Sequence, residues 1–266
     1  MSGKLTMSQA EAKKKLDAIR KVYEEAMKEP HFSALIMGES GVGKTSCIAT
    51  GRAPILIDSF DPLGTLVLRD EIQKGRVIVR SFWNEKYDEP TEFEKWKETW
   101  DADLKSGFIG SVGTYAIDSV TTLTESLVNW YTKKKRRENQ IPQIQDYQVI
   151  YNVLKDLVKI SSAQGCDFIL TGHLVAEKDE VSGRIYAELD TYKRLKSRIP
   201  LLFTEKFVLT TRDTSSGNKY VLLTQPDGKY RASTQLGKGG IFQREEEPNL
   251  KKLLAKAKLP SGDKQL

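Results

Sequence analysis

A glycine-rich segment that directly follows an apolar run is the strongest indication of the fold of this chain. The apolar residues 34–37 are followed by Gly38-Glu39-Ser40-Gly41-Val42-Gly43-Lys44-Thr45, which satisfies the pattern G-x-x-x-x-G-K-S/T in full. Glycines let such a loop wrap with its backbone N–H groups turned inward, and residues 44–49 can begin a helix. The segment therefore predicts a strand, a phosphate-binding loop (P-loop) and a helix, the opening unit of an α/β fold.

The P-loop also supplies the candidate nucleotide-binding residues. They are the loop residues and the start of the helix, namely Gly38, Glu39, Ser40, Gly41, Val42, Gly43, Lys44, Thr45 and Ser46. We expect Lys44 to reach the β- and γ-phosphates of ATP and the Thr45 hydroxyl to hold Mg²⁺. The alternative is a glycine-rich turn without a ligand, which the complete match and its strand–helix context disfavour.

A second strand pattern, residues 114–118, ends in an aspartate. An acid at the carboxyl end of a buried parallel strand lies at the edge of the sheet where α/β proteins bind ligands. Asp118 is therefore the candidate second ligand of Mg²⁺. The alternative role is that of a helix N-cap, because a helical pattern begins at Ser119.

Short apolar runs and helical patterns alternate over the first two thirds of the chain. The apolar runs are residues 33–37, 54–57, 76–79, 114–117 and 168–170. This alternation predicts an α/β fold with a mainly parallel central sheet and helices on both of its faces. Residues 174–188 and the pair 206–212 and 220–224 predict antiparallel strands added at the C-terminal edge.

The predicted organisation is one domain with two appendages. Residues 1–31 predict a helix that begins at a capping box, Ser8 to Glu11, and ends before Pro30; it packs on its own domain or on a neighbouring subunit. Residues 32–258 form the P-loop domain, and residues 259–266 are expected to be a flexible tail.

Composition narrows the class of protein without identifying a partner. The formal charge of +6 permits a polyanionic partner but does not require one. No stretch is long and apolar enough to predict a membrane span, and the lysine-rich N-terminus does not resemble a signal peptide. Cys47 and Cys166 lack metal-ligand spacing, so we expect reduced, packed thiols and a cytoplasmic protein.

Several segments resemble a known family. The stretch Ile117-Asp118-Ser119-Val120-Thr121-Thr122-Leu123-Thr124 resembles the Walker B segment of RecA-type recombinases. The RecA-like, Sak-type single-strand annealing ATPases of bacteriophages are similar over roughly residues 32–256, including segments 52–58, 168–173 and 228–231. The resemblance implies a RecA-like P-loop ATPase that acts in phage recombination, annealing or replication, in the host cytoplasm. Its implied partners are single-stranded DNA, further copies of the chain in a ring or filament, and a single-strand-binding protein.

The resemblance also implies roles for particular residues. His173 stands where RecA-like proteins place a polar sensor of the γ-phosphate, although a histidine at a strand end can equally be a core residue. Family members place a catalytic glutamate two residues after Asp58, where this chain has Phe60, so Asp61 and then Asp58 are the candidate bases and turnover is expected to be slow. Arg231 and Lys229 are candidates for the cation that completes a neighbouring site. The alternatives for that cation are Lys193, Arg194 and Arg198.

A basic run supplies the candidate DNA-binding residues, which are Lys133, Lys134, Lys135, Arg136 and Arg137, with Trp130 just before them. Cations beside an aromatic ring suit phosphate neutralisation and base stacking, whereas the alternative is a solvated surface. A second functional hypothesis is an ATP-dependent assembly or conformational switch with weak hydrolysis and a protein partner, which the Phe60 departure favours. A small-molecule kinase would need a lid and acceptor-binding residues, for which the sequence offers no candidates.

Overall fold

The computed structural model describes residues 7–26, 30–86, 88–137, 141–181, 183–215 and 217–265. The chain divides into two compact units, Met1–Pro30 and His31–Leu266, which are described separately. No helix in these ranges is both long enough and apolar enough to span a membrane.

The first unit contains helix α1 (Gln9–Ala26). The Ser8 N–H donates to Glu11 Oε2 at 2.9 Å and the Glu11 N–H donates to Ser8 Oγ at 3.3 Å, which is the predicted capping box. Leu16 and Ile19 of the expected apolar stripe are exposed, and Met27 lies outside the described residues. The packing of this helix, on its own domain or on a neighbouring subunit, stays a prediction.

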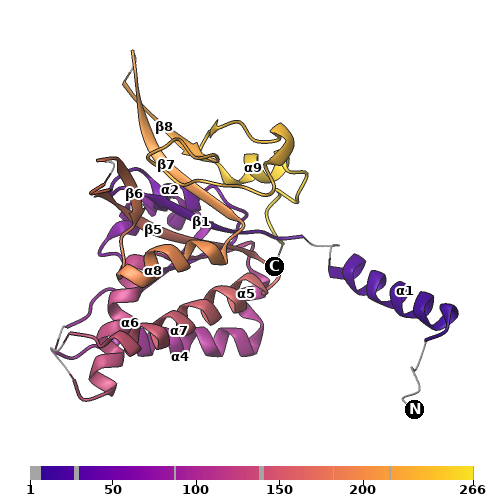
Figure 1. Cartoon of the computed structure of the whole chain (residues 1–266), viewed down its shortest axis with the longest axis horizontal. Helices are drawn as coiled ribbons and strands as arrows, with labels where there is room; N and C mark the ends of the chain where they lie inside the picture. The colour runs from indigo at the N-terminus through magenta and orange to yellow at the C-terminus, as the bar shows by residue number, and fades with distance from the viewer. Residues whose placement is uncertain are drawn as a thin grey trace. The chain divides into compact units, whose positions relative to one another are not determined.

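The second unit is built on one sheet, which in the described part of the chain has nine strands in the order β3-β2-β4-β5-β1-β7-β8-β9, with β6 paired to β5 (Figure 1). The parallel strands are β1 (Ser33–Gly38), β2 (Ile55–Ser59), β3 (Val77–Ser81), β4 (Thr114–Asp118), β5 (Asp167–Lys178) and β7 (Glu205–Thr214). The antiparallel strands are β6 (Ile185–Leu189), β8 (Gly217–Leu223) and β9 (Glu245–Glu246). The predicted mainly parallel sheet with antiparallel additions is confirmed.

Strand β7 differs from the expectation in one respect. It was expected only as one half of an antiparallel hairpin, but it also pairs in parallel with β1, from Ala34 opposite Glu205 to Met37 opposite Val208. The turns of both late hairpins include one residue, Ser182 or Ser216, that lies outside the described residues.

Helices cover both faces of the sheet, as the alternating pattern predicts (Figure 1). The face that carries Leu35 and Leu56 is covered by α4 (Glu92–Ser106), α5 (Phe108–Ser111), α6 (Val120–Lys134), α7 (Ile144–Ser162), α8 (Lys193–Arg198) and η2 (Pro200–Leu202). The face that carries Ile36 and Ile57 is covered by α2 (Lys44–Ile48), η1 (Gly64–Leu68) and α9 (Leu250–Lys256). Two further short helices are α3 (Arg69–Gln73) and η3 (Lys238–Gly240).

The residues after α9 correct the expectation of a flexible tail. The Asp263 carboxylate accepts the Ala53 N–H at 2.6 Å and pairs with Lys251 at 2.6 Å, and the Lys264 N–H donates to the Ala53 carbonyl at 2.7 Å. These polar contacts fix the end of the chain against the loop before β2. They escape sequence analysis because each joins residues far apart in the chain.

Candidate functional site

The site lies where the carboxyl ends of neighbouring parallel strands meet. Gly38 at the end of β1 is opposite His173 in β5, and Asp118 at the end of β4 is opposite Ser59 in β2. Register alone thus brings together the P-loop, the predicted metal ligand and the predicted sensor, as expected for the ligand-binding edge of an α/β sheet.

The P-loop has the conformation that its glycines permit. Gly41 and Gly43 have φ angles of 77° and 92°, in the left-handed region where a side chain would be strained. At Gly38 a Cβ atom would lie 2.6 Å from the carbonyl oxygen of Leu209, so the close approach of β7 also requires glycine there.

Lys44 is almost fully buried at the centre of this loop, with 5% of its surface exposed. Its Nζ donates to the carbonyl oxygens of Gly38 at 3.0 Å and Glu39 at 2.9 Å. Burial lowers the pKa of Lys44, although the charges of Asp118 and Asp61 oppose the shift. None of the ion pairs among the described residues includes Lys44, so this buried cation fits an anionic ligand such as a phosphate chain.

Thr45 and Asp118 meet as predicted for a magnesium site. The Thr45 hydroxyl donates to Asp118 Oδ2 at 2.6 Å, and the Thr171 hydroxyl donates to the other carboxylate oxygen. Asp118 is fully buried, and burial raises its pKa in spite of these two hydrogen bonds. A buried carboxylate beside a hydroxyl is a set of hard oxygen donors that fits Mg²⁺, which binds through one or two protein oxygens together with phosphates and water.

No cluster of three or more His, Cys, Asp or Glu side chains suited to a metal occurs in the described ranges. Cys47 and Cys166 are buried and free, and burial raises the pKa of each thiol to about 12. This agrees with the expectation of inert, packed thiols.

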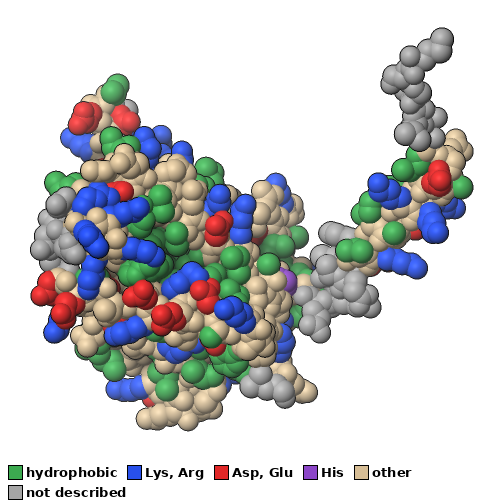
Figure 2. Space-filling view, turned by 90° about the horizontal axis from the view of Figure 1, so that it is seen from below, with side chains coloured by type: hydrophobic (Ala, Val, Ile, Leu, Met, Phe, Trp, Pro, Cys, Tyr) green, Lys and Arg blue, Asp and Glu red, His purple; other side chains and the backbone are tan. Residues whose placement is uncertain are grey.

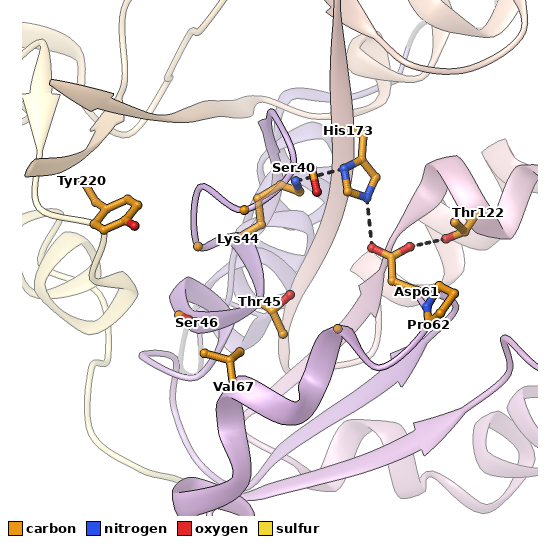
Figure 3. A pocket seen from close by; sticks show the side chains of 13 residues that line it. Ser40, Lys44, Thr45, Ser46, Asp61, Pro62, Val67, Thr122, His173 and Tyr220 are labelled. Atoms are coloured by element: carbon orange, nitrogen blue, oxygen red, sulfur yellow. Dashed lines mark hydrogen bonds and ion pairs between the residues drawn. The ribbon is translucent and has the colours of Figure 1, made fainter. Parts of the chain in front are cut away.

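Asp61 and His173 form a polar chain with Lys44 (Figure 3). His173 Nδ1 lies 3.2 Å from Lys44 Nζ, and its Nε2 lies 3.0 Å from Asp61 Oδ2. Because the Lys44 ammonium can only donate, Nδ1 is the acceptor, and the neutral ring then donates its Nε2–H to Asp61. The imidazole thus connects the P-loop lysine with the candidate base, which is consistent with the predicted sensor position.

The carboxylate of Asp61 is held on its other side by two hydroxyl groups. Oδ1 accepts hydrogen bonds from Ser119 at 2.9 Å and from Thr122 at 2.6 Å. Burial by itself raises the pKa of Asp61, but the hydrogen bonds from His173 and the two hydroxyls more than offset it, and the pKa lies below its ordinary value. Asp61 is therefore ionised and oriented toward the cleft.

The structure does not bring Asp58 to the cleft. Its carboxylate is fully buried and accepts hydrogen bonds from Arg80, from Trp96 Nε1 at 2.9 Å and from the Tyr115 hydroxyl at 2.7 Å. These partners stand on the α4 side of the sheet, because Asp58 shares its face with Leu56. Of the two candidate bases, Asp61 is the one in position, and the expectation for Asp58 is corrected. Phe60 packs in the same core against Phe82 and Trp96.

These residues surround a cleft of about 640 Å³, a volume within the range of small-molecule sites. It is lined by Ser40, Gly41, Gly43, Lys44, Thr45, Ser46, Asp61, Pro62, Gly64, Val67, Thr122, His173 and Tyr220 (Figure 3). Sequence reasoning did not propose Ser119, Thr122, Thr171 or Tyr220 as site residues. The hydroxyls of residues 119–122 directly follow Asp118, and that adjacency was the available signal for two of them.

The candidate bridging cations lie outside this cleft. Lys229 Nζ and the Tyr230 hydroxyl each lie 3.3 Å from Glu39 Oε1, so the late turn contacts the P-loop of its own chain. Arg231 is mostly exposed, 3.9 Å from Glu188 and over the ring of Tyr186. Arg198 lies over the ring of Tyr151, and the part of Lys193, Arg194 and Arg198 in a neighbouring site stays a prediction.

The basic run lies at the C-terminal end of α6 and in the residues that follow it. Lys134 and Lys135 are exposed and lie over the rings of Trp130 and Tyr131 at 4.6 and 5.6 Å. Arg137 instead pairs at 2.9 Å with Asp146, the buried carboxylate of the capping box of α7. Trp130 is half-buried and packs against Phe93, and its stacking on bases stays a prediction.

Figure 2, which views the domain from the side of α4, α6 and α7, shows a group of Lys and Arg side chains toward the left and a mixture of basic and acidic side chains over the rest of this face. The part of the basic run in DNA binding stays a prediction.

A buried P-loop lysine, a threonine–aspartate pair and a parallel sheet define a P-loop NTPase domain. The family profile described as AAA_24, an AAA domain, matches residues 31–235, and the chain belongs to this family. A solved KaiC-like protein from the archaeon Pyrococcus horikoshii is similar, with 15% identity and a TM-score of 0.43 over 78% of this chain and 84% of that one. No curated protein matches the chain.

Proposed function

We propose that this chain is a magnesium-dependent ATPase that acts on single-stranded DNA in recombination, annealing or replication. The observation that carries the ATPase part is one cleft in which buried Lys44, the Thr45–Asp118 pair and ionised Asp61 converge. The similarity to the Sak-type ATPases of phages supplies the DNA substrate, the self-association and the host-cytoplasmic setting of the proposal.

The site divides the work of hydrolysis among three groups. Lys44 binds the β- and γ-phosphates, while Thr45 and Asp118 would hold Mg²⁺, which supplies positive charge against the phosphate oxygens when bound. Asp61 orients the attacking water and accepts a hydrogen bond from it. His173 responds to the γ-phosphate, because it contacts both Lys44 and Asp61.

Turnover by such a site is slow. A general base is most effective when its pKa lies near the working pH, whereas three hydrogen bonds hold the pKa of Asp61 below even the ordinary aspartate value. This observation also favours the second candidate function, an ATP-dependent assembly or conformational switch whose main partner is a protein.

The nucleotide part is tested by Lys44→Ala. We expect much weaker ATP binding and no hydrolysis, because Lys44 is the buried cation of the loop. The circular dichroism spectrum should be unchanged. Lys105→Ala, an exposed lysine on α4, is the matched control and should behave as the unaltered protein. If Lys44→Ala bound ATP as tightly as the control, the proposed site would be wrong.

The DNA part is tested by replacing Lys133, Lys134 and Lys135 with glutamine while Arg137, which stabilises α7, is kept. If all three contact phosphates, the log–log salt slope for single-stranded DNA, about −0.7 per contact, should flatten by about 2, with ATP affinity unchanged. The matched control replaces Lys13, Lys14 and Lys15, three exposed cations of α1. An unaltered affinity and slope in the first variant would favour the switch with a protein partner.

A further inference from the structure

The nucleotide cleft has two chemically different ends. Lys44, Asp61 and His173 form a polar end, joined by the hydrogen bonds described above. The lining also includes Val67 and Tyr220, which take no part in that chain. Figure 3 shows Tyr220 on the opposite side of the P-loop from Asp61 and Thr122. The cleft therefore extends past the phosphate-binding groups to an aromatic side chain.

Strand pairing holds Tyr220 toward the P-loop. In the β7–β8 hairpin Leu209 is opposite Leu222, and Thr211 is opposite Tyr220. Side chains two residues apart share one face of a strand, so Tyr220 stands on the same face as Leu222 and Leu209. Leu209 itself reaches the loop, with its Cδ2 3.7 Å from where a Cβ of Gly43 would be. The ring of Tyr220 is thus positioned by a paired hairpin and not by a free loop.

The ring of Tyr220 is not engaged in the folded chain. It is 49% exposed, and none of the hydrogen bonds or ring contacts found among the described residues uses its side chain. On η1, Leu66 and Val67 are exposed as well, at 64% and 63%. Apolar and aromatic surface left open beside a phosphate-binding loop suits the remaining part of a nucleotide, its flat base.

We propose that Tyr220 forms the base subsite of this cleft, where its ring stacks on the purine of a bound nucleoside triphosphate. The inference rests on the proposed nucleotide binding and adds the group that recognises the base. Recognition uses the face of the purine, so the contribution of Tyr220 is the same for adenine and guanine, since every base has a π-face. The phosphates and the base are then held by separate parts of the fold, α2 with its loop and the β7–β8 hairpin.

The test compares ligands that share phosphates but differ in the base. Calorimetric titration of Tyr220→Ala should show about tenfold weaker binding of ATP and of GTP, the scale of base–aromatic stacking, and unchanged binding of inorganic tripolyphosphate. Tyr220→Phe keeps the ring and should restore the affinity for both nucleotides. Lys219→Ala, whose side chain points to the other face of β8, is the matched control and should change nothing.

Each outcome separates this inference from the proposal beneath it. If Tyr220→Ala binds ATP as tightly as the unaltered protein, or loses tripolyphosphate binding to the same extent, Tyr220 is not the base subsite and the nucleotide site stands. If the unaltered protein binds neither ATP nor tripolyphosphate, the nucleotide site itself is wrong and the inference is wrong with it. Tyr220 is half exposed, and an unchanged thermal unfolding curve shows that each variant folds.

Discussion

Two aspartates near the end of β2, Asp58 and Asp61, belong to two very different polar networks. Asp58 is fully buried and neutralised by Arg80, which stands directly opposite it on β3. Asp61 lies just past the strand, where its carboxylate is 17% exposed and is held by His173 and two hydroxyls. The Asp58 carboxylate is enclosed by its partners, whereas that of Asp61 opens into the nucleotide cleft.

The direction of a side chain, more than its type, therefore separates a structural carboxylate from a catalytic candidate in this fold. Strand alternation turns Asp58 toward α4, where Trp96 and Tyr115 add two more donors. Burial, followed by the charge of Asp58, raises the pKa of Tyr115, so this phenol remains a hydrogen-bond donor. Asp61 lies beyond the end of β2, so the alternation of side chains along the strand does not turn it toward α4.

The sharpest test of the comparison is Asp61→Asn, a change of nearly the same size that removes the negative charge. We expect kcat for ATP hydrolysis to fall by roughly two to four orders of magnitude, the usual scale of general-base catalysis. ATP affinity and the midpoint of urea unfolding should change little. A mild loss of activity, equal to that of Asp58→Asn, would show that the base lies elsewhere.

Asp58→Ala should have the opposite profile. It leaves the Arg80 guanidinium, which is 21% exposed, without its main partner and two buried donors without an acceptor, so we expect the free energy of unfolding to fall by about 3–5 kcal/mol. Activity per folded molecule should remain. Asp103→Ala removes the second carboxylate on Arg80 and serves as the milder control. If Asp58→Ala were as stable as the unaltered protein but did not hydrolyse ATP, the structural role assigned to Asp58 would be wrong.

A third carboxylate, that of Asp263, lies at the surface and can be compared with those of Asp58 and Asp61. Burial alone raises its pKa, but hydrogen bonds from Lys251 and from the Ala53 N–H lower it to about 2. A folded pKa below the unfolded value of about 3.9 contributes stability above that value, which is lost as the pH falls from about 4 to about 2. Because the side chain is 42% exposed, solvent screens the interaction, and we expect less than about 1 kcal/mol.

The measurement is urea unfolding of Asp263→Asn and of the unaltered chain at several pH values. The variant should be slightly less stable near neutral pH, and the difference should vanish at about pH 2. A difference that does not change with pH would mean that the charge of Asp263 does not anchor the end of the chain.

Sequence patterns were enough to predict the P-loop, the strand before it, Asp118 as the metal ligand candidate and the alternation that leads to a mainly parallel sheet. These are patterns between residues close in the chain, where glycine freedom and hydrophobic periodicity act locally. The structure keeps this arrangement, with Thr45 and Asp118 in contact and His173 opposite Gly38.

The folded structure was needed to show which aspartate reaches the cleft, that Trp130 packs on Phe93, that β7 runs parallel to β1 and that Asp263 contacts the loop before β2. Each of these depends on which distant segments become neighbours, and residue type carries no information about that choice. The same holds for Tyr220, which reaches the cleft because two distant strands pair beside the P-loop. The physical reason is that burial and hydrogen-bond partners are properties of the packed sheet, whereas propensity and spacing are properties of the chain.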